Sequence, residues 1–235
     1  MLSRDNLHSY QNRASEFILE KKRCQLFLDM GLGKTVSTLT ALTDLFDSFE
    51  IRRALVIGPL RVANTVWKQE SQKWEHTQDL SIKIATGTPK NRIAALVSTA
   101  EVIAINRENV QWLVDFYCKN TKNGRYNINK WPFDCVVIDE SSSFKSHKSQ
   151  RFKALKRILP KTDYMVELTG TPAPNGLLDL WSQAYLIDQG AALGRNMTAY
   201  KNRYFDADYM GYSLTPKKHT KEKVEKLIAT FTLSM

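Results

Sequence analysis

Residues 24–35 of the chain read CQLFLDMGLGKT, an apolar run followed by a glycine-rich turn. The apolar run predicts a buried β-strand, and the residues after the turn predict a helix with one apolar face. The residues of that face are Val36, Leu39, Leu42, Leu45, Phe46 and Phe49. A glycine-rich turn between a strand and a helix is the context of a phosphate-binding loop, because backbone N–H groups and the helix N-terminus converge on an anion. This stretch therefore predicts a P-loop.

Each residue type in the loop has a role in holding a nucleoside triphosphate. The predicted ATP-binding residues are Met30, Gly31, Leu32, Gly33, Lys34 and Thr35. Lys34 is expected to reach the β- and γ-phosphates, and the Thr35 hydroxyl to coordinate Mg²⁺. The match to the full P-loop pattern is incomplete, since Leu28 stands where the first glycine belongs. A chance match therefore stays open on this stretch alone.

Two adjacent carboxylates, Asp139 and Glu140, follow a second apolar run, FDCVVI. The carboxyl ends of parallel strands meet at one edge of a sheet, so we expect this pair beside the P-loop. Asp139 is predicted to bind Mg²⁺ together with Thr35, and Glu140 to orient and deprotonate the attacking water. The predicted catalytic residues are Glu140, Lys34 and Asp139. The alternative is a helix N-cap in front of Ser141.

Six short β-rich runs alternate with helical patterns along the chain. They cover residues 24–28, 53–58, 81–85, 101–105, 133–139 and 163–169. This alternation predicts an α/β fold with a mainly parallel sheet, and continuous apolar strands such as VVI predict helices on both faces of that sheet.

We expect one domain over residues 1–235, with two segments that depart from this pattern. Residues 117–132 are polar, basic and turn-rich, and they predict a basic surface insertion. Residues 203–219 mix aromatic side chains with Gly, Pro and Lys, and they predict an irregular aromatic and basic segment. A charged helix is expected after it, over residues 221–231.

Basic residues outnumber acidic ones by 34 to 24, which gives the chain a net charge of +10. Such a surplus favours polyanions as partners. Its strongest local form is residues 141–162, which contain no acidic residue. A solvated helix face explains this run equally well.

Cysteine usage and apolar patterning bear on the compartment. The three cysteines are odd in number and far apart, which supports neither a disulfide framework nor a zinc site. The first ten residues lack a signal-peptide core, and no apolar run is long enough to cross a bilayer. We therefore expect a cytoplasmic protein that has no membrane partner.

A third element, LTGTP, ends the sixth run at Pro172. Taken alone it predicts a simple turn. Placed beside the Asp139 and Glu140 pair, its hydroxyls are suited to hydrogen-bond that pair and to sense whether γ-phosphate is present.

GKT, DE and TGTP in this order resemble the motifs of superfamily two helicases and translocases, specifically the Swi/Snf-like branch and its phage-encoded members. The stretches that carry the resemblance are LHSYQNRASEF, DMGLGKT, LVIGPLRVANTVWKQESQKW, VIDESSSFKS and ELTGTPAPNGLLDLWSQAYLID. They span nearly the whole chain. The resemblance implies a RecA-like P-loop domain of a DNA-dependent ATPase that uses ATP and Mg²⁺. The family's phage-encoded members imply a bacterial or phage-infected cell as the location.

The resemblance also implies roles for residues outside the P-loop. Gln11 matches the glutamine that reads the adenine edge. Pro59, Leu60 and Arg61 match a loop that touches a phosphate backbone, and Asn64 and Trp67 continue its helix. Thr169, Gly170 and Thr171 match the motif that couples nucleotide state to the DNA track. The chain departs from the family at Ser142, where a histidine is usual.

The family's motor has two RecA-like lobes, and the second supplies arginines to the transferring phosphate. We expect this chain to be a monomer, either a piece of such a motor or a single-lobed protein. It is expected to bind duplex DNA and to be largely inactive without a second lobe in cis or in trans. The alternative is a non-catalytic, nucleotide-responsive module that binds DNA or a protein. A P-loop kinase or metabolic ATPase fits GKT, but it does not explain TGTP or the net charge.

Overall fold

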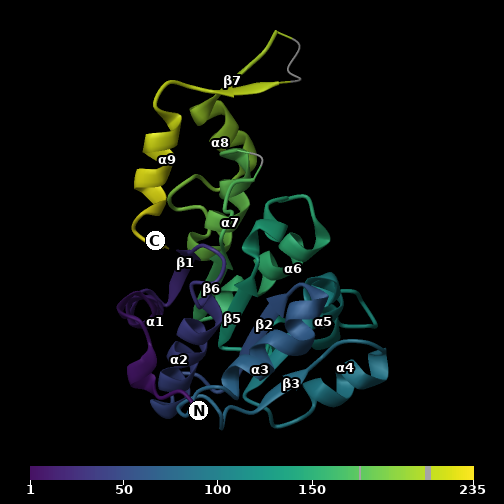
Figure 1. Cartoon of the computed structure of the whole chain (residues 1–235). Helices are drawn as coiled ribbons and strands as arrows, with labels where there is room; N and C mark the ends of the chain where they lie inside the picture. The colour runs from purple at the N-terminus through teal and green to yellow at the C-terminus, as the bar shows by residue number, and fades with distance from the viewer. Residues whose placement is uncertain (175, 210–212) are drawn as a thin grey trace.

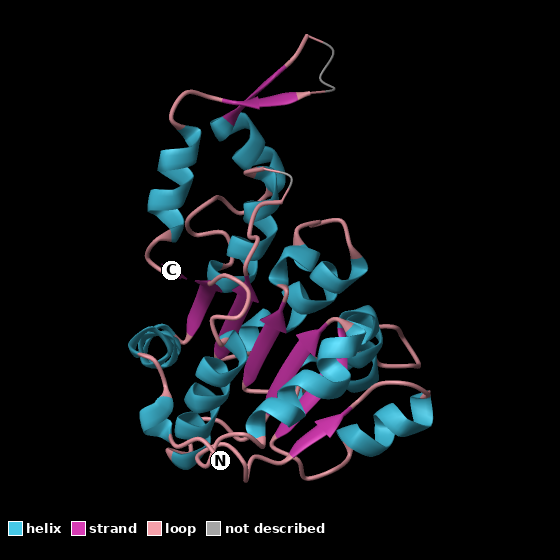
Figure 2. Ribbon diagram, viewed as in Figure 1, coloured by secondary structure: helices cyan, strands magenta, loops and turns pink. Residues whose placement is uncertain are grey.

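The computed structural model describes residues 1–174, 176–209 and 213–235, and at its centre lies a seven-stranded parallel sheet (Figures 1 and 2). The strand order is β3-β4-β2-β5-β6-β1-β9. The strands are β1 (Arg23–Phe27), β2 (Ala54–Gly58), β3 (Ile82–Ile84), β4 (Val102–Asn106), β5 (Cys135–Asp139), β6 (Tyr164–Thr169) and β9 (Thr232–Ser234). Every residue of β2, β4, β5 and β6 is buried. The sheet is therefore covered on both faces.

Helices cover both faces of the sheet, so successive residues of a strand are buried against helices on opposite faces. They are α1 (Ser9–Lys21), α2 (Lys34–Asp47), α3 (Trp67–Ser71), α4 (Pro89–Leu96), α5 (Val110–Cys118), α6 (Gln150–Ile158), α7 (Leu178–Asp188), α8 (Met197–Tyr204) and α9 (Thr220–Ile228). Leu55 and Ile57 of β2 pack in one cluster with side chains of α5, α6 and α7. Ala54 and Val56 pack in the other with side chains of α1 and α2. This period of two follows from the pleat of a strand.

The α/β fold with helices on both faces is confirmed, and each of the six predicted β-rich runs overlaps a strand. Two predictions about helices are wrong. Phe49 was expected on the buried face of the helix after the P-loop, but α2 ends at Asp47 and Phe49 is 89% exposed. The chain turns there, with Phe49 at a φ of 58°, to enter β2.

The second correction concerns the charged helix expected over residues 221–231. The helix α9 ends at Ile228, and the chain then turns so that Thr232–Ser234 joins the sheet beside β1. A three-residue strand is too short to show an alternating pattern in sequence. Only its place beside β1 makes it a strand.

A helical extension made of α8 and α9 stands beyond the carboxyl edge of the sheet (Figure 1). The preceding helix α7 packs on one face of the sheet, where Arg23 of β1 donates to the carbonyls of Leu186 and Ile187. Residues 203–219 were expected to be irregular. They contain instead the end of α8 and an antiparallel pair, β7 (Phe205–Ala207) with β8 (Leu214–Pro216). Residues 210–212 of that segment, and Asn175 of the TGTPAPNG stretch, lie outside the described residues.

Residues 119–125 of the 117–132 segment are all exposed. The segment folds back on itself through an antiparallel bridge between Lys119 and Tyr126.

The three cysteines, Cys24, Cys118 and Cys135, are buried and unpaired, and burial raises the pKa of each thiol. Within the described residues, no helix combines the length and apolar character that a membrane span requires.

Candidate functional site

The P-loop lies between the end of β1 at Phe27 and the start of α2 at Lys34. Gly31 and Gly33 have φ angles of 84° and 73°, in the left-handed region that glycine adopts without strain. At Gly33 a Cβ atom would lie 2.2 Å from Nε2 of Gln11. A side chain at Gly33 is therefore excluded by both backbone conformation and space.

Lys34 is folded over the loop. Its Nζ donates to the carbonyl oxygens of Leu28 at 2.7 Å and Asp29 at 3.0 Å. These two carbonyls hold the ammonium group close to the turn, at the N-terminus of α2. A positive charge and a helix N-terminus lie together here, which is the arrangement that attracts a phosphate group.

Asp139 ends β5 and is buried, with 8% of its surface exposed. The indole Nε1 of Trp67 donates to its Oδ2 at 3.0 Å. Burial raises the pKa of Asp139 to about 6, and the negative charge of the neighbouring Glu140 adds to this rise. The hydrogen bond from Trp67 and the positive charge of Lys34 act in the opposite direction and lower the pKa. The carboxylate is thus poorly solvated and lies within the field of the P-loop lysine.

Glu140 is half-buried and has a φ of 58°, which is uncommon for a residue with a side chain. It precedes a short 3-10 helix, Ser141–Phe144, but its side chain makes no capping hydrogen bond. The N-cap alternative is therefore not supported by the side-chain geometry. Backbone strain at a carboxylate of this kind is a frequent feature of functional sites.

The TGTP segment packs against the entrance of the P-loop. The amide of Leu28 donates to the carbonyl of Thr169 at 3.2 Å. The Thr169 hydroxyl accepts from the amide of Thr171 at 3.1 Å. A Cβ atom at Gly170 would lie 3.3 Å from the carbonyl oxygen of Leu28, so this glycine permits the close approach.

A buried glutamine on α7, Gln183, joins the carboxylate loop to the TGTP segment. Its Oε1 accepts from the Ser141 hydroxyl at 2.9 Å, and its Nε2 donates to the Pro172 carbonyl at 2.6 Å. Among the described residues, the threonine hydroxyls of TGTP make no direct bond to Asp139 or Glu140. Gln183 lies in a stretch that carries the resemblance, but sequence reasoning assigned it no role, because a single glutamine in an apolar helix does not reveal its partners.

Gln11 lies near the start of α1 and is buried against the P-loop. Its Oε1 accepts from the backbone N–H of His8 at 2.9 Å. The rings of His8 and Tyr10 stack beside it, with centroids 5.3 Å apart. The residue assigned to adenine by resemblance thus lies next to Gly33, at the position where α1 meets α2.

The Pro59-Leu60-Arg61 loop follows β2 at the same edge of the sheet. Leu60 is 51% exposed and Arg61 is also exposed. The helix that they open contains one π-helical segment, Val62–Val66, before α3 begins at Trp67. π-helical segments are rare and occur frequently at functional sites. This helix connects the exposed loop to the tryptophan that bonds Asp139.

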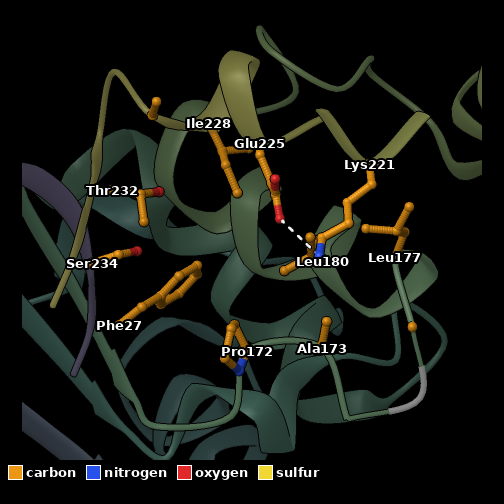
Figure 3. Close-up of a pocket in the computed structure, with 12 residues that line it drawn as sticks. Phe27, Pro172, Ala173, Leu177, Leu180, Lys221, Glu225, Ile228, Thr232 and Ser234 are labelled. Carbon is orange, nitrogen blue, oxygen red and sulfur yellow. Dashed lines mark ion pairs between the residues drawn. The ribbon is translucent and has the colours of Figure 1, made fainter. Parts of the chain in front are cut away.

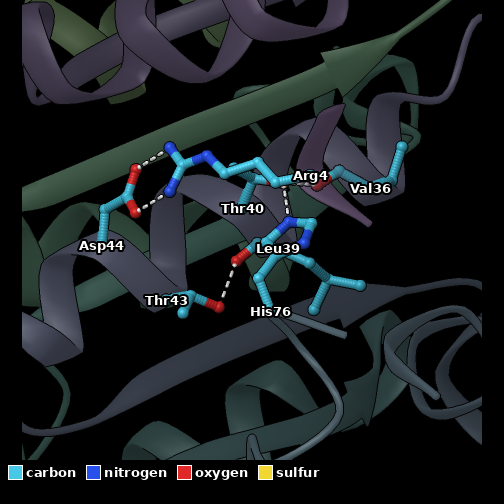
Figure 4. A network of polar contacts seen from close by, with 7 residues as sticks. All are labelled: Arg4, Val36, Leu39, Thr40, Thr43, Asp44 and His76. Atoms are coloured by element: carbon cyan, nitrogen blue, oxygen red, sulfur yellow. Dashed lines mark hydrogen bonds and ion pairs between the residues drawn. The ribbon is translucent and has the colours of Figure 1, made fainter. Parts of the chain in front are cut away.

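Two polar contacts anchor the helix that carries Lys34 (Figure 4). Arg4 donates to both carboxylate oxygens of Asp44 at 2.6 Å. The Thr40 hydroxyl lies 2.8 Å from Nε2 of His76. These contacts tie α2 to the N-terminal segment and to the turn after α3. They therefore hold in place the helix that follows the P-loop.

An apolar cavity of about 740 Å³ lies beside the site, between the ends of β1 and β9, the TGTP segment and α9 (Figure 3). Phe27, Pro172 and Ile228 line it, and Lys221 pairs with Glu225 across 3.9 Å at its α9 side. The cavity reaches Phe27, just before the P-loop, but its lining does not include Lys34 or Asp139.

Comparison with known families gives one match over nearly the whole chain, since residues 8–232 match the SNF2-related domain. Putative protein p41 of Acyrthosiphon pisum secondary endosymbiont phage 1 is 41% identical over 203 residues, which are 83% of this chain and 42% of that protein. The uncharacterized ATP-dependent helicase MG018 of Mycoplasma genitalium is 32% identical over 76% of this chain and 16% of that protein. The mouse DNA excision repair protein ERCC-6-like is 30% identical over 75% of this chain and 14% of that protein. The chain thus spans less than half the length of these relatives.

Two solved structures of the SWI2/SNF2 ATPase core of Sulfolobus solfataricus share the fold. One, a complex with dsDNA, has a TM-score of 0.75 and 24% identity, and the match covers 98% of this chain and 44% of that chain. The other, the core domain, has a TM-score of 0.71 and 25% identity, and covers 98% of this chain and 43% of that chain. The match over residues 8–232 identifies the chain as a member of the SNF2-related domain family.

Proposed function

We propose that this lobe binds ATP with Mg²⁺ at the carboxyl edge of the sheet and hydrolyses it when a second RecA-like lobe completes the site. The observation that carries the proposal is that a P-loop lysine at the N-terminus of α2 and a buried carboxylate at the end of β5 lie close enough for the charge of Lys34 to lower the pKa of Asp139. Lys34 and the backbone N–H groups of Gly31 and Gly33 hold the phosphates.

The residues present fit a magnesium ion. Thr35 and Asp139 offer a hydroxyl and a carboxylate oxygen, the donor types that Mg²⁺ prefers, and the phosphates supply further oxygens. Burial disfavours the charge of Asp139 in the free lobe, so a cation is the partner that this carboxylate lacks. A magnesium ion held there would supply positive charge to the phosphate oxygens.

Glu140 is the residue proposed to position and deprotonate the attacking water. It follows Asp139 directly and makes no capping bond that would occupy its carboxylate. Phosphoryl transfer also needs positive charge on the far side of the γ-phosphate, and an arginine placed there contributes roughly 10³ to 10⁵ in rate. We assign that arginine to a second lobe, in cis or in trans.

Duplex DNA is the proposed track, and Pro59, Leu60 and Arg61 are the proposed contact. The exposed Arg61 and the net charge of +10 favour a phosphate backbone. One structural neighbour is a complex with dsDNA, which supports the same substrate class. Thr169, Gly170 and Thr171 are proposed to couple the track to ATP, since they pack on the P-loop entrance. We propose that the lobe acts as a monomer.

Steady-state phosphate release tests this function. The chain alone is expected to turn over very slowly with or without DNA, and addition of a second family lobe, fused or in trans, should raise the rate and make it DNA-dependent. Several turnovers per second from the chain alone would contradict the two-lobe proposal. ATP binding that never leads to turnover in the two-lobed form would favour a nucleotide-responsive binding module.

A further inference from the structure

A second cavity, of about 540 Å³, lies between α8 and α9 in the helical extension. We call it the basic cavity. Four of its lining residues are basic and none is acidic; the lining includes Arg203, Tyr204, Lys217, Thr220, Lys223 and Lys226. The P-loop, the carboxylate pair and the Pro59–Arg61 loop do not contribute to it. The basic cavity is therefore a separate feature of the surface.

The two faces of α9 line different cavities. Lys223 and Lys226 are three residues apart, so they share one face, and both line the basic cavity. Lys221 and Glu225 line the apolar cavity of Figure 3 on the other side. The charge in the basic cavity is thus a property of one helix face rather than of the helix as a whole.

Local hydrogen bonds fix the remaining wall of the basic cavity. The amide of Lys217 and the hydroxyl of Thr220 both donate to the Tyr204 carbonyl at 2.9 Å. The guanidinium of Arg203 lies 5.3 Å from the centroid of the Tyr204 ring. Lys217 also donates to the Asn202 carbonyl at 2.8 Å. The fold itself therefore brings these basic side chains to one cavity.

The positive charge is mostly uncompensated. Across the described part of the chain, the one ion pair made by these four basic residues joins Lys217 to Asp206 at 3.9 Å. Arg203, Lys223 and Lys226 face one cavity with no carboxylate within ion-pair distance among the described residues. Like charges that line one cavity repel one another, and an anion bound between them relieves that repulsion.

We propose that the basic cavity binds the phosphate backbone of DNA, as a second contact apart from the Pro59–Arg61 loop. This rests on the proposed function, in which DNA is the polyanion that the lobe meets. Several closely spaced phosphates satisfy several cations at once, and both lysine ammonium and arginine guanidinium groups bind phosphate oxygens. The extension also stands beyond the sheet edge at which the proposed track contact lies (Figure 1). An acidic peptide is the competing polyanion, and the experiment separates the two.

Duplex binding by fluorescence anisotropy over a series of salt concentrations provides the test. The double variant Lys223→Gln with Lys226→Gln removes two charges and keeps good helix formers. Its matched control, Lys218→Gln with Lys221→Gln, removes two exposed charges at the start of α9 and on its other face. Removing one lysine–phosphate bond lowers the slope of log affinity against log salt by about 0.9, so the cavity variant should show a slope smaller by about two units. Affinity should fall roughly two- to thirtyfold, the range for two exposed ion pairs.

Each outcome has a distinct meaning. Equal slopes and affinities for the cavity variant and its control, while Arg61→Ala still weakens binding, would overturn this inference and leave the proposed function standing. Failure of the parent chain to bind duplex at any salt concentration would overturn both. A cavity variant that loses binding to fluorescent polyglutamate while its duplex affinity is unchanged would assign the cavity to acidic peptides. Circular dichroism of each variant checks that α9 is intact.

Discussion

The indole Nε1 of Trp67 donates a hydrogen bond to Oδ2 of Asp139 over 3.0 Å, with the tryptophan fully buried. Trp67 begins α3, at the end of the helix that the Pro59–Arg61 loop opens. Asp139 is the proposed magnesium ligand. A single hydrogen bond thus joins the proposed DNA contact to the proposed nucleotide site, so movement of that helix on DNA can act on the carboxylate directly.

Trp67→Phe should weaken binding of Mg²⁺-ATP by about two- to tenfold, the usual value of one hydrogen bond. The bond from Trp67 lowers the pKa of Asp139, so its loss favours the protonated carboxyl, which does not bind a cation. Isothermal titration calorimetry measures the change. Trp74→Phe is the matched control, because it removes the indole bond to Glu70 away from the site. Equal affinities of the two variants would show that the Trp67 bond does not support the site.

Lys34→Ala should lower ATP affinity by at least about tenfold, because the variant cannot make a charge-assisted bond to phosphate. The melting temperature should change little, since the bonds that Lys34 makes within the described residues go to two carbonyl oxygens of its own loop. Calorimetric titration with ATP checks the first expectation, and an exposed lysine variant, Lys21→Ala, is the control. Unchanged affinity would remove the P-loop assignment.

Glu140→Gln should spare ATP binding and reduce turnover roughly 10²- to 10⁴-fold in a two-lobed form, since the amide keeps the size of the side chain but cannot accept the proton of water. Phosphate release at saturating ATP is the measurement. The isosteric change Gln150→Glu, on the first residue of α6, is the control for a one-charge change near this loop. Turnover equal to that of the parent would mean that Glu140 does not position the water.

Arg61→Ala should weaken duplex binding and lower its salt slope by about one unit, because alanine cannot bind the phosphate that Arg61 is proposed to neutralise. Arg61 is exposed and its side chain makes no hydrogen bond among the described residues, so the fold should not change. Anisotropy at several salt concentrations tests this. An unaltered slope would place the track contact elsewhere.

Glu167 predicts a pH dependence of stability. It is fully buried on β6, its Oε2 accepts from Gln25 Nε2 at 2.8 Å, and its Oε1 has no hydrogen-bond partner among the described residues. Burial raises its pKa well above 4.5. The folded state therefore holds this proton more tightly than the unfolded chain does. The resulting stabilisation is complete below the unfolded value and is lost as pH rises through the folded value.

Glu167→Gln should remove that dependence, because glutamine accepts the same bond and stays neutral. One proton changes the free energy of unfolding by at most about 1.4 kcal/mol per pH unit. Denaturant unfolding at about pH 5 and about pH 8 should show a smaller loss for the variant than for the parent. Exposed Glu222→Gln serves as the control. Parallel losses in variant and parent would mean that Glu167 ionises normally.

The sequence by itself determined the layered α/β fold and the succession of six strands along the chain, since apolar runs and helical periodicity are local properties of the chain. It also placed Asp139 at the end of one strand and Lys34 in the turn and helix that follow another. Parallel strands share one carboxyl edge, so residues that follow them lie together without further information. The family resemblance rests on the same local stretches, from GKT to TGTP.

Only the tertiary structure decided which partners these residues have. Trp67 and Gln183 lie in stretches that carry the resemblance, but nothing in those stretches predicts their bonds to Asp139 and Pro172, which join segments far apart in the chain. The strand β9 and the basic cavity arise in the same way, from the path of the chain after α7. Such contacts depend on packing between distant elements, which leaves no periodic pattern in the sequence. Local patterns thus predict the elements and their order, whereas burial and long-range packing set the pKa of Asp139 and the charge of the cavity.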